Sequence, residues 1–308
     1  MHVVRQMISQ PAVSVIMAVY NGAEYVEDAI ESILEQTCSD FEFIIINDGS
    51  TDRTHEIICK YNDPRIRLIN QENTGLTRAL NVGLSLARGR YIARIDADDI
   101  SLPERLEKQV ALFEKNKDVV LQGSLFCLIN VKNGRLYFKH LPNTERKLRL
   151  FLALRGTPFR HSTVMFRRSV VEKVGVYNEK YVTAQDYEYW IRIAAQHRIA
   201  MLPEYLCLAR DNIDESIVSS RSRRNQLALL IRLKKEAFRN LRISRIYIIP
   251  SFAFTLASIL PKNLFRYGIV AKMSSIITRM AGKSSSETPK NKEGIICLAE
   301  RLIKSKDI

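Results

Sequence analysis

Residues 91–99, with the sequence YIARIDADD, join a short apolar run to three aspartates within four positions. An apolar run of this length, bounded by polar residues, predicts a buried β-strand over residues 91–95. Asp96, Asp98 and Asp99 follow directly at its carboxyl end. In an open α/β sheet, ligands bind beyond the carboxyl ends of the strands. This stretch therefore predicts both a strand and the place where a ligand binds.

Strands and helices alternate on both sides of this stretch. Further strands are predicted over residues 13–19, 41–47 and 66–70, and helices over residues 23–36, 54–61, 76–87 and 103–116. Ser101 and Glu104 have the spacing of a capping box at the start of the last of these helices. The alternation predicts an α/β fold with a mostly parallel, Rossmann-like sheet and helices on both faces.

The chain divides into an α/β body, residues 1–214, and a basic, partly apolar helical region, residues 215–308. Within the body, residues 12–118 carry the alternating pattern, whereas residues 119–214 begin with short strands around an Asn133-Gly134 turn signal. The formal net charge is +14, and residues 221–308 hold 19 Lys and Arg against 5 Asp and Glu. The whole excess of positive charge therefore lies in the C-terminal region, which predicts an anionic partner.

An uncharged apolar segment, residues 246–260, lies within this basic region and is interrupted by Pro250. It is shorter than the roughly 20 residues that a helix needs to span a bilayer. We therefore expect it to lie on an anionic membrane surface, and we expect no nucleic-acid binding. The alternative, that it is an ordinary buried pair of core helices, stays open.

Several other classes of protein are excluded by missing motifs. No G-x-G-x-x-G follows the first strand and no P-loop occurs, which excludes the common dinucleotide and P-loop sites. The five cysteines are scattered and the histidines lack ligand spacing, which favours reduced thiols and no zinc site. Residues 13–19 are followed by no cleavage site, so we expect a strand rather than a signal peptide, and a cytoplasmic protein.

The cluster of acids predicts a divalent cation. Carboxylates repel a diphosphate, so a cation must lie between them, and hard oxygen ligands favour Mg²⁺ or Mn²⁺. The alternative is that Asp98 and Asp99 only place negative charge at the start of the helix over residues 103–116.

Six motifs in order resemble those of the family 2 glycosyltransferases, which have the GT-A fold. They are SVIMAVYNG, IIINDGSTD, ENTGLTRALNVGL, YIARIDADD, HSTVMFRR and AQDYEYWIR, within residues 12–208. The resemblance implies an inverting, metal-dependent transferase of bacterial surface polysaccharide synthesis. The sugar donor it implies is a nucleoside diphosphate sugar, and we expect a UDP-sugar. Two alternatives are a sugar nucleotidyltransferase, which normally needs a glycine-rich phosphate loop that this chain lacks, and a non-catalytic protein that binds anionic surfaces.

The resemblance implies that residues 12–118 bind the nucleotide and residues 119–214 the acceptor. On the nucleotide side it implicates Tyr20, Asn21, Asp48, Arg78 and Asp96. Asp98 and Asp99 are the implied ligands of Mn²⁺ or Mg²⁺. The alternatives are that Tyr20 is an aromatic residue of the core and that Arg78 is a solvent-exposed charge on its helix.

On the acceptor side, Asp186 matches the family's catalytic base, and a helix N-cap is its alternative role. The family usually has an acid immediately before this aspartate, whereas this chain has Gln185, which can hydrogen-bond a sugar but cannot act as a base; Glu188 is a weaker candidate base. His161 is implied to approach the donor, and Trp190 can stack on a sugar, although a structural His and a core Trp are the commoner outcomes.

These assignments predict the partners and the location. The donor is a nucleoside diphosphate sugar, the acceptor a lipid-linked oligosaccharide, and the protein lies on the inner face of the cell membrane through its basic region. The sequence does not identify the sugar or the linkage.

Overall fold

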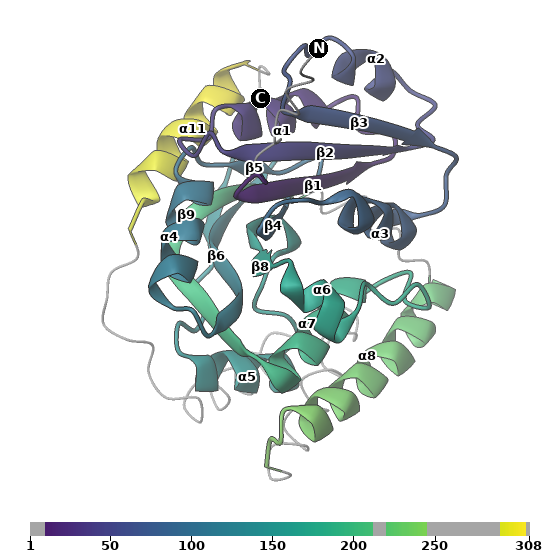
Figure 1. The fold of residues 1–308 in the computed structure, drawn as a ribbon, viewed down its shortest axis with the longest axis vertical. Coiled ribbons are helices and arrows are strands. Elements are labelled where there is room, and N and C mark those ends of the chain that lie inside the picture. Colours follow the sequence, from purple (N-terminus) through teal and green to yellow (C-terminus); the bar gives the residue numbers. More distant parts are fainter. Residues whose placement is uncertain (1–9, 212–219, 245–289, 306–308) are drawn as a thin grey trace, which may run out of the picture.

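The computed structural model describes residues 10–211, 220–244 and 290–305, and it confirms the α/β architecture (Figure 1). In its first half, strands alternate with helices in this order: β1 (Val13–Val19), α1 (Val26–Leu34), β2 (Phe41–Asp48), α2 (Thr54–Ile58), β3 (Ile66–Gln71), α3 (Leu76–Leu86) and β4 (Tyr91–Arg94). All four strands predicted in this half are present, and their bounds differ from the expected ones by at most one residue.

The second half is more mixed than the alternation of the first half. Its elements are β5 (Ile100–Ser101), α4 (Arg105–Lys115), β6 (Val119–Asn130), β7 (Leu136–Phe138), α5 (Glu145–Leu154), the 3-10 helix η1 (His161–Thr163), β8 (Met165–Arg167), α6 (Ser169–Val174), α7 (Gln185–Gln196), β9 (Arg198–Asp211), α8 (Ser220–Asn240) and α11 (Lys292–Ser305). The long strand β9 was not predicted. The hairpin around Gly134 is confirmed, with a φ of 64° at this glycine.

Within the described residues one sheet has the strand order β3-β2-β1-β4-β8-β6-β9-β5, and β7 pairs with β6. The first four strands in this order are parallel. β8 is antiparallel to both β4 and β6, so it joins the parallel half to the pair of long strands β6 and β9. Because β8 reverses the direction, the sheet is parallel only in part.

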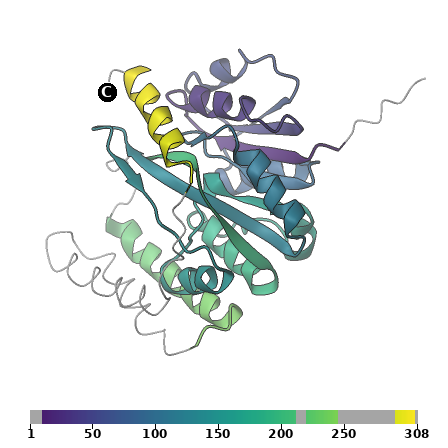
Figure 2. The ribbon, with the colours of Figure 1, turned by 90° about the vertical axis from the view of Figure 1, so that its left-hand side faces the viewer.

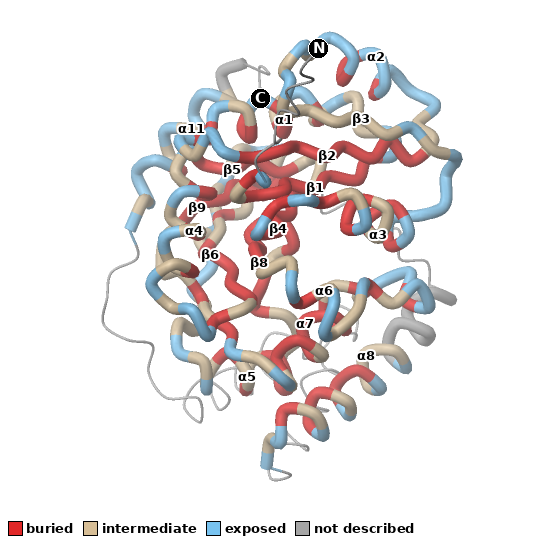
Figure 3. The backbone as a smooth tube through the Cα atoms, in the orientation of Figure 1, coloured by how far each residue is buried: buried red, intermediate tan, exposed pale blue. Residues whose placement is uncertain are grey.

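Helices cover both faces of the sheet, and side chains of β1 alternate between the two layers. Val15 and Met17 pack with α1, α2 and α4, whereas Ile16 and Ala18 pack with α3. Figure 3 shows the central strands as buried along almost their whole length. A strand buried on both faces has the continuous apolar sequence seen in residues 15–19.

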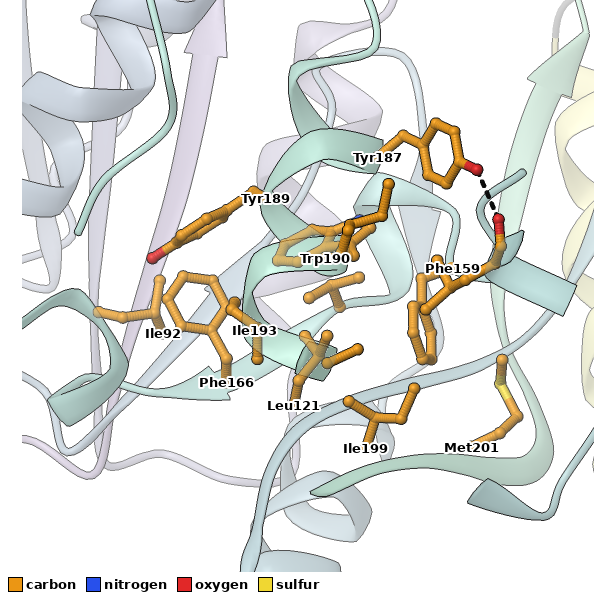
Figure 4. Close-up of a cluster of buried hydrophobic side chains, with 14 of the residues drawn as sticks. Ile92, Leu121, Phe159, Phe166, Tyr187, Tyr189, Trp190, Ile193, Ile199 and Met201 are labelled. Carbon is orange, nitrogen blue, oxygen red and sulfur yellow. Dashed lines mark hydrogen bonds between the residues drawn. The ribbon is translucent and has the colours of Figure 1, made fainter. Parts of the chain in front are cut away.

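An aromatic cluster fills the core beneath the second half (Figure 4). The Trp190 side chain on α7 is fully buried, with its ring centroid 5.4 Å from that of Tyr189 and 6.0 Å from that of Phe166. The Tyr187 hydroxyl donates a hydrogen bond to the Leu152 carbonyl on α5, so α7 and α5 are joined within this core. Trp190 is therefore a residue of the core, the commoner of the two roles considered for it.

The described parts of the basic C-terminal region pack on the body. α8 contacts α5 and α7, and α11 contacts β9 (Figure 2). None of the helices in the described ranges is long and apolar enough to cross a membrane. The apolar segment 246–260 lies outside the described residues, so its interfacial placement and the domain boundary at residue 215 stay predictions.

The expected capping box at the start of α4 is absent. Helix α4 begins at Arg105 with no side-chain cap, because Ser101 belongs to β5 and its hydroxyl accepts a hydrogen bond from the Arg105 guanidinium at 2.9 Å.

Gly83 on α3 supplies a test of the packing between α3 and β1. A Cβ atom at this position would lie 2.5 Å from Cγ2 of Ile16, which is 1% exposed and has no room to move. Alanine favours helix by up to about 1 kcal/mol over glycine, but overpacking a core costs about 1–3 kcal/mol. We expect Gly83→Ala to lower the free energy of unfolding by about 1–2 kcal/mol in urea titrations. Ser85→Ala, on the exposed side of the same helix, is the control, and a stabilised Gly83→Ala variant would contradict the close packing.

Candidate active site

Asp96 follows β4 and has a complete set of polar partners. Its Oδ1 lies 2.7 Å from a guanidinium nitrogen of Arg94, whose side chain is 1% exposed. The Ser162 hydroxyl accepts a hydrogen bond from the Asp96 amide at 3.0 Å and lies 3.1 Å from its Oδ2. Burial raises the pKa of Asp96, but the charge of Arg94, together with that of Arg160 and the neighbouring polar groups, outweighs burial and holds the pKa at about 2. Asp96 is therefore a fixed anion.

Asp99 is fully buried and is also satisfied by the protein. The Arg160 guanidinium donates to both of its oxygens, at 3.2 Å each. The Arg210 amide donates to Oδ1 at 3.2 Å, and the Ser162 hydroxyl donates to Oδ2. A carboxylate with this many donors has little capacity left for a cation. The structure thus gives Asp99 a structural role, in place of the metal-ligand role that the sequence implied.

Asp98 differs from both neighbours. Within the described residues no ion pair reaches its carboxylate, although the Arg210 guanidinium donates to its backbone carbonyl at 2.8 Å. Burial, followed by the charges of Asp99 and Asp96, raises the pKa of Asp98 to about 7. The charge of Arg160 acts in the opposite direction but does not offset these effects, so the charged form of Asp98 is stabilised less than that of Asp96.

The fit of a divalent cation can be tested on these groups. Among the described residues no three His, Cys, Asp or Glu side chains are grouped so as to hold a metal ion. Mg²⁺ is usually held by one or two carboxylates together with substrate phosphates and water rather than by a cage of protein ligands. Asp98, as an unpaired carboxylate, fits such a site, whereas Asp99 does not.

The loops after β1 and β2 are fastened to each other and to the start of α3. Asp48 is 3% exposed, and its Oδ1 accepts from Gln71 at 2.6 Å and from the Thr74 amide at 3.0 Å. Its Oδ2 accepts from the Gly75 amide at 2.9 Å, where the backbone φ is 90°. Asp48 therefore holds the turn that leads into α3.

Asn21 and Tyr20 lie on the neighbouring loop, and both are exposed. Asn21 has a positive φ of 52°, and its Oδ1 accepts from the Thr51 amide at 2.8 Å, so its side chain ties two loops together. The Tyr20 ring is 52% exposed. The core-aromatic alternative for Tyr20 is therefore wrong, and its face is open to a planar ligand.

Arg78 lies in the first turn of α3 and pairs with Glu179 at 3.2 Å, with both side chains largely in solvent. Exposed ion pairs of this kind contribute little to stability. Its guanidinium is therefore held loosely and can exchange its partner.

His161 is 8% exposed and lies between Asp96 and Tyr177. Its Nε2 is 2.9 Å from the Tyr177 hydroxyl, and its Nδ1 is 3.9 Å from Asp96 Oδ1. Burial, followed by the charge of Arg94, lowers the pKa of His161 to about 3, so the ring is neutral. His161 is thus a buried neutral side chain that packs between Asp96 and Tyr177, and it contributes no positive charge to the site.

Asp186 and Gln185 begin α7, directly after Ala184, which has a positive φ of 57°. Asp186 accepts a hydrogen bond from the Tyr187 amide at 2.7 Å, and no arginine or lysine within the described residues forms an ion pair with it. Burial raises the pKa of Asp186 to about 6, and the charge of Asp96 adds to this rise. The structure therefore brings Asp186 close to Asp96, while Gln185 beside it is 6% exposed.

The sequence analysis missed the residues that neutralise the acids. Arg94 lies inside the predicted strand, and Arg160, Ser162 and Arg210 are 61 or more positions away from Asp99 along the chain. Arg105 was missed too, although it donates to the carbonyls of Arg94 and Val164 at 2.7 and 3.1 Å and fixes the end of β4. Arg94 was the one residue of this group that a local pattern could have indicated, because it is an arginine within an apolar run and so needs a buried acidic partner.

Comparison with known sequences gives a consistent picture. The model of glycosyl transferase family 2 matches residues 14–175. A Methanocaldococcus jannaschii protein named as a glycosyltransferase is 37% identical over 210 residues, which cover 65% of this chain and 70% of that protein. Bacillus subtilis EpsE, also named as a glycosyltransferase, is 38% identical over 218 residues, 68% of this chain and 76% of that protein. The amylovoran biosynthesis glycosyltransferase AmsE of Erwinia amylovora is 32% identical over 207 residues, 65% and 77%.

Other relatives are longer. A Rickettsia felis glycosyltransferase is 36% identical over 191 residues, which cover 59% of this chain and 31% of that protein.

Solved structures share the fold at low sequence identity. The structure of S. aureus TarS 1–349 in complex with UDP-GlcNAc has a TM-score of 0.58 and 17% identity, and the match covers 91% of this chain and 94% of that one. The mannosyltransferase PcManGT of Pyrobaculum calidifontis, in complex with GDP-Man and Mn²⁺, has a TM-score of 0.57 and 20% identity, with 96% and 81% covered.

Asp98 and Asp99 allow the same substitution to be compared at adjacent positions. Asp99→Asn breaks a buried ion pair, so we expect the free energy of unfolding to fall by about 3 kcal/mol, near the low end for such pairs because Arg160 is partly exposed. Asp98→Asn removes a carboxylate that forms no ion pair and on which burial and the charges of Asp99 and Asp96 outweigh the charge of Arg160, so we expect no loss of stability. Thermal unfolding in EDTA at pH 8 measures both, and equal effects of the two variants would contradict this division.

Proposed function

This chain belongs to glycosyltransferase family 2, and we propose that it transfers a sugar with inversion from a UDP-sugar to a lipid-linked oligosaccharide, with Mn²⁺ or Mg²⁺ bound. The chain is a glycosyltransferase with the GT-A fold that its motifs implied. One observation carries the finer proposal. Among the aspartates that follow β4 and begin α7, Asp98 and Asp186 alone form no ion pair within the described residues, and the resemblance implied metal binding for Asp98 and proton transfer for Asp186.

The donor side is proposed from exposure and loop geometry. The exposed ring of Tyr20 suits stacking against a nucleobase, because an aromatic face is apolar and planar. Asp48 and Asn21 shape the loops around it, and any contact of their own with the nucleotide stays a prediction. TarS and PcManGT hold UDP-GlcNAc and GDP-Man, which supports a nucleotide-sugar donor; the choice of UDP is ours.

Asp98 would hold the cation, with Asp96 beside it as a fixed anion. A divalent cation bound there supplies positive charge that stabilises the leaving diphosphate. The Mn²⁺ in PcManGT supports this choice of metal. Arg78, whose partner Glu179 is in solvent, can turn to the diphosphate as a second source of positive charge.

Asp186 is proposed as the general base. An acceptor hydroxyl has a high pKa and attacks poorly, so a carboxylate that takes its proton during attack on the anomeric carbon accelerates transfer. The raised pKa of about 6 keeps Asp186 ionised at neutral pH and makes it a stronger base than an ordinary carboxylate. One displacement from the face opposite the diphosphate inverts the anomeric centre. Gln185, at the same helix start, can hydrogen-bond the acceptor sugar.

The acceptor and the location are proposed on two grounds. AmsE is named for amylovoran biosynthesis, which supports a role in making a polysaccharide. The positive charge concentrated in residues 221–308 supports contact with an anionic membrane surface, where a lipid-linked acceptor is found.

Calorimetric titration with UDP, with and without Mn²⁺, tests the donor and metal assignments. We expect wild-type protein to bind UDP more tightly with Mn²⁺, and Asp98→Asn to lose this difference, because its amide is a poorer ligand for a cation. Asp99→Asn, examined at a temperature where it is folded, is the matched control and should keep the difference. Unchanged Mn²⁺ dependence in Asp98→Asn would place the metal elsewhere.

Replacement of Asp186 tests the base. Asp186→Asn should bind UDP as wild type does but release UDP from its donor at least ~100-fold more slowly. In wild type, kcat should fall as pH drops below about 6, because protonated Asp186 cannot accept a proton. The variant should lack this decline. A panel of UDP-sugars with coupled detection of UDP gives both measurements, and an Asp186→Asn variant with normal turnover would remove the proposed base.

A further inference from the structure

The loop between α6 and α7, residues 175–184, is fastened to one face of α3. The Asn81 amide donates to the Tyr177 carbonyl at 3.0 Å and accepts from the Tyr177 backbone N–H, also at 3.0 Å. One turn earlier on the helix, the Thr77 hydroxyl donates to the Tyr181 carbonyl at 2.9 Å, and it is buried. Two side chains of α3 thus pair with the backbone of this loop as a neighbouring strand would.

Both N–H groups and the oxygen of the Asn81 side-chain amide form hydrogen bonds here. Its second N–H donates to Glu179 Oε1 at 3.1 Å, while the other oxygen of Glu179 pairs with Arg78. Among the neutral side chains of this size, an amide combines an acceptor with two donors. Asn81 therefore keeps its contacts with the loop even when Arg78 exchanges its partner.

The loop connects the donor half of the site to the acceptor half in two ways. Tyr177 is 2% exposed, and its hydroxyl lies 2.9 Å from His161 Nε2, with the other nitrogen of His161 facing Asp96. The loop ends at Ala184, whose left-handed φ of 57° turns the chain directly into Asp186. Displacement of this loop would move both the support of Asp96 and the position of Asp186.

The beginning of the loop is held by side chains of α7. The Arg192 guanidinium donates to the Val174 and Val176 carbonyls at 2.6 and 2.7 Å, and the Tyr189 hydroxyl donates to the Gly175 carbonyl at 2.7 Å. These contacts fix the loop to the acceptor half only. Hydrogen bonds from Thr77 and Asn81, together with the exposed Arg78 pair, join the loop to the donor half.

We propose that Asn81 is a positioning residue, which clamps residues 176–184 to α3 and so sets the place of Asp186 relative to Asp96 and the donor. This inference rests on the proposed function, since it concerns the same base. Asn81 acts through the loop backbone and touches no reacting atom. The start of α3 is held in turn by Asp48 through Thr74 and Gly75, so the clamp extends the rigid donor loops to the base.

The test compares Asn81→Ala with wild type and with Ser85→Ala, a matched control on the same helix that lies away from the loop. Three quantities are measured: the Kd of UDP with Mn²⁺, the kcat of UDP release from the most active UDP-sugar of the panel, and hydrogen exchange of residues 176–184. We expect an unchanged Kd, faster exchange of the loop amides including Tyr177, and a kcat lowered about 10- to 100-fold, since small misplacements of a reacting group cost this much.

A second pair of variants guards against misfolding of Asn81→Ala. Thr77→Val removes one buried hydrogen bond without changing the side-chain shape, and it should lower kcat in the same direction with an unchanged Kd. Thr77→Ser keeps the hydroxyl, so its kcat should stay close to that of wild type.

Two results would overturn the inference while leaving the proposed function intact. One is a kcat of Asn81→Ala within twofold of that of the Ser85→Ala control, and the other is a loss in UDP affinity as large as the loss in kcat. A wild-type protein that neither binds UDP nor releases it from any donor would overturn the proposed function, and the role of Asn81 with it.

Discussion

Three aspartates close together at the end of β4 repel one another, and the site depends on the arginines that offset this repulsion. Arg94 reaches Asp96 from within the strand, and Arg160 reaches Asp99 from the segment before η1. Removing charges from water costs several kcal/mol each, so such pairs add little net stability. Instead, these pairs determine how the elements are arranged, because the charges are balanced only when β4, η1 and β9 meet at this edge of the sheet.

The chemistry of each aspartate follows from its neighbours and not from its residue type. Asp48 and Asp99 are saturated by donors and serve as structural anchors. Asp96 is ionised beside Arg94, whereas Asp98 and Asp186 are left with raised pKa values and no basic partner among the described residues. A protein that balances two acids of a triplet and leaves the third has retained one unfavourable charge, which is the expected state of a group that binds a cation from outside.

The sequence allowed the parallel half of the fold and the position of the acids to be predicted, because both depend on local patterns. Alternating apolar runs locate β1 to β4, and the residues that end these strands must share an edge. The arginine partners could not be predicted, since Arg210 meets Asp99 through the pairing of β9 with β5, which no local pattern indicates. For the same reason the residue types could not separate Asp99 from Asp98, or show that Trp190 lies inside the core and Tyr20 in solvent.

The described C-terminal helices pack at two separate places on the body. Figures 1 and 2 place α8 and α11 at opposite ends of the molecule, one against α5 and α7 and the other against β9. Because α7 begins with Gln185 and Asp186, the packing of α8 supports the helix that carries the proposed base. The loops that follow β1 and β2 lie on the other side of β4 in the sheet, so the two halves of the site are held by different parts of the fold.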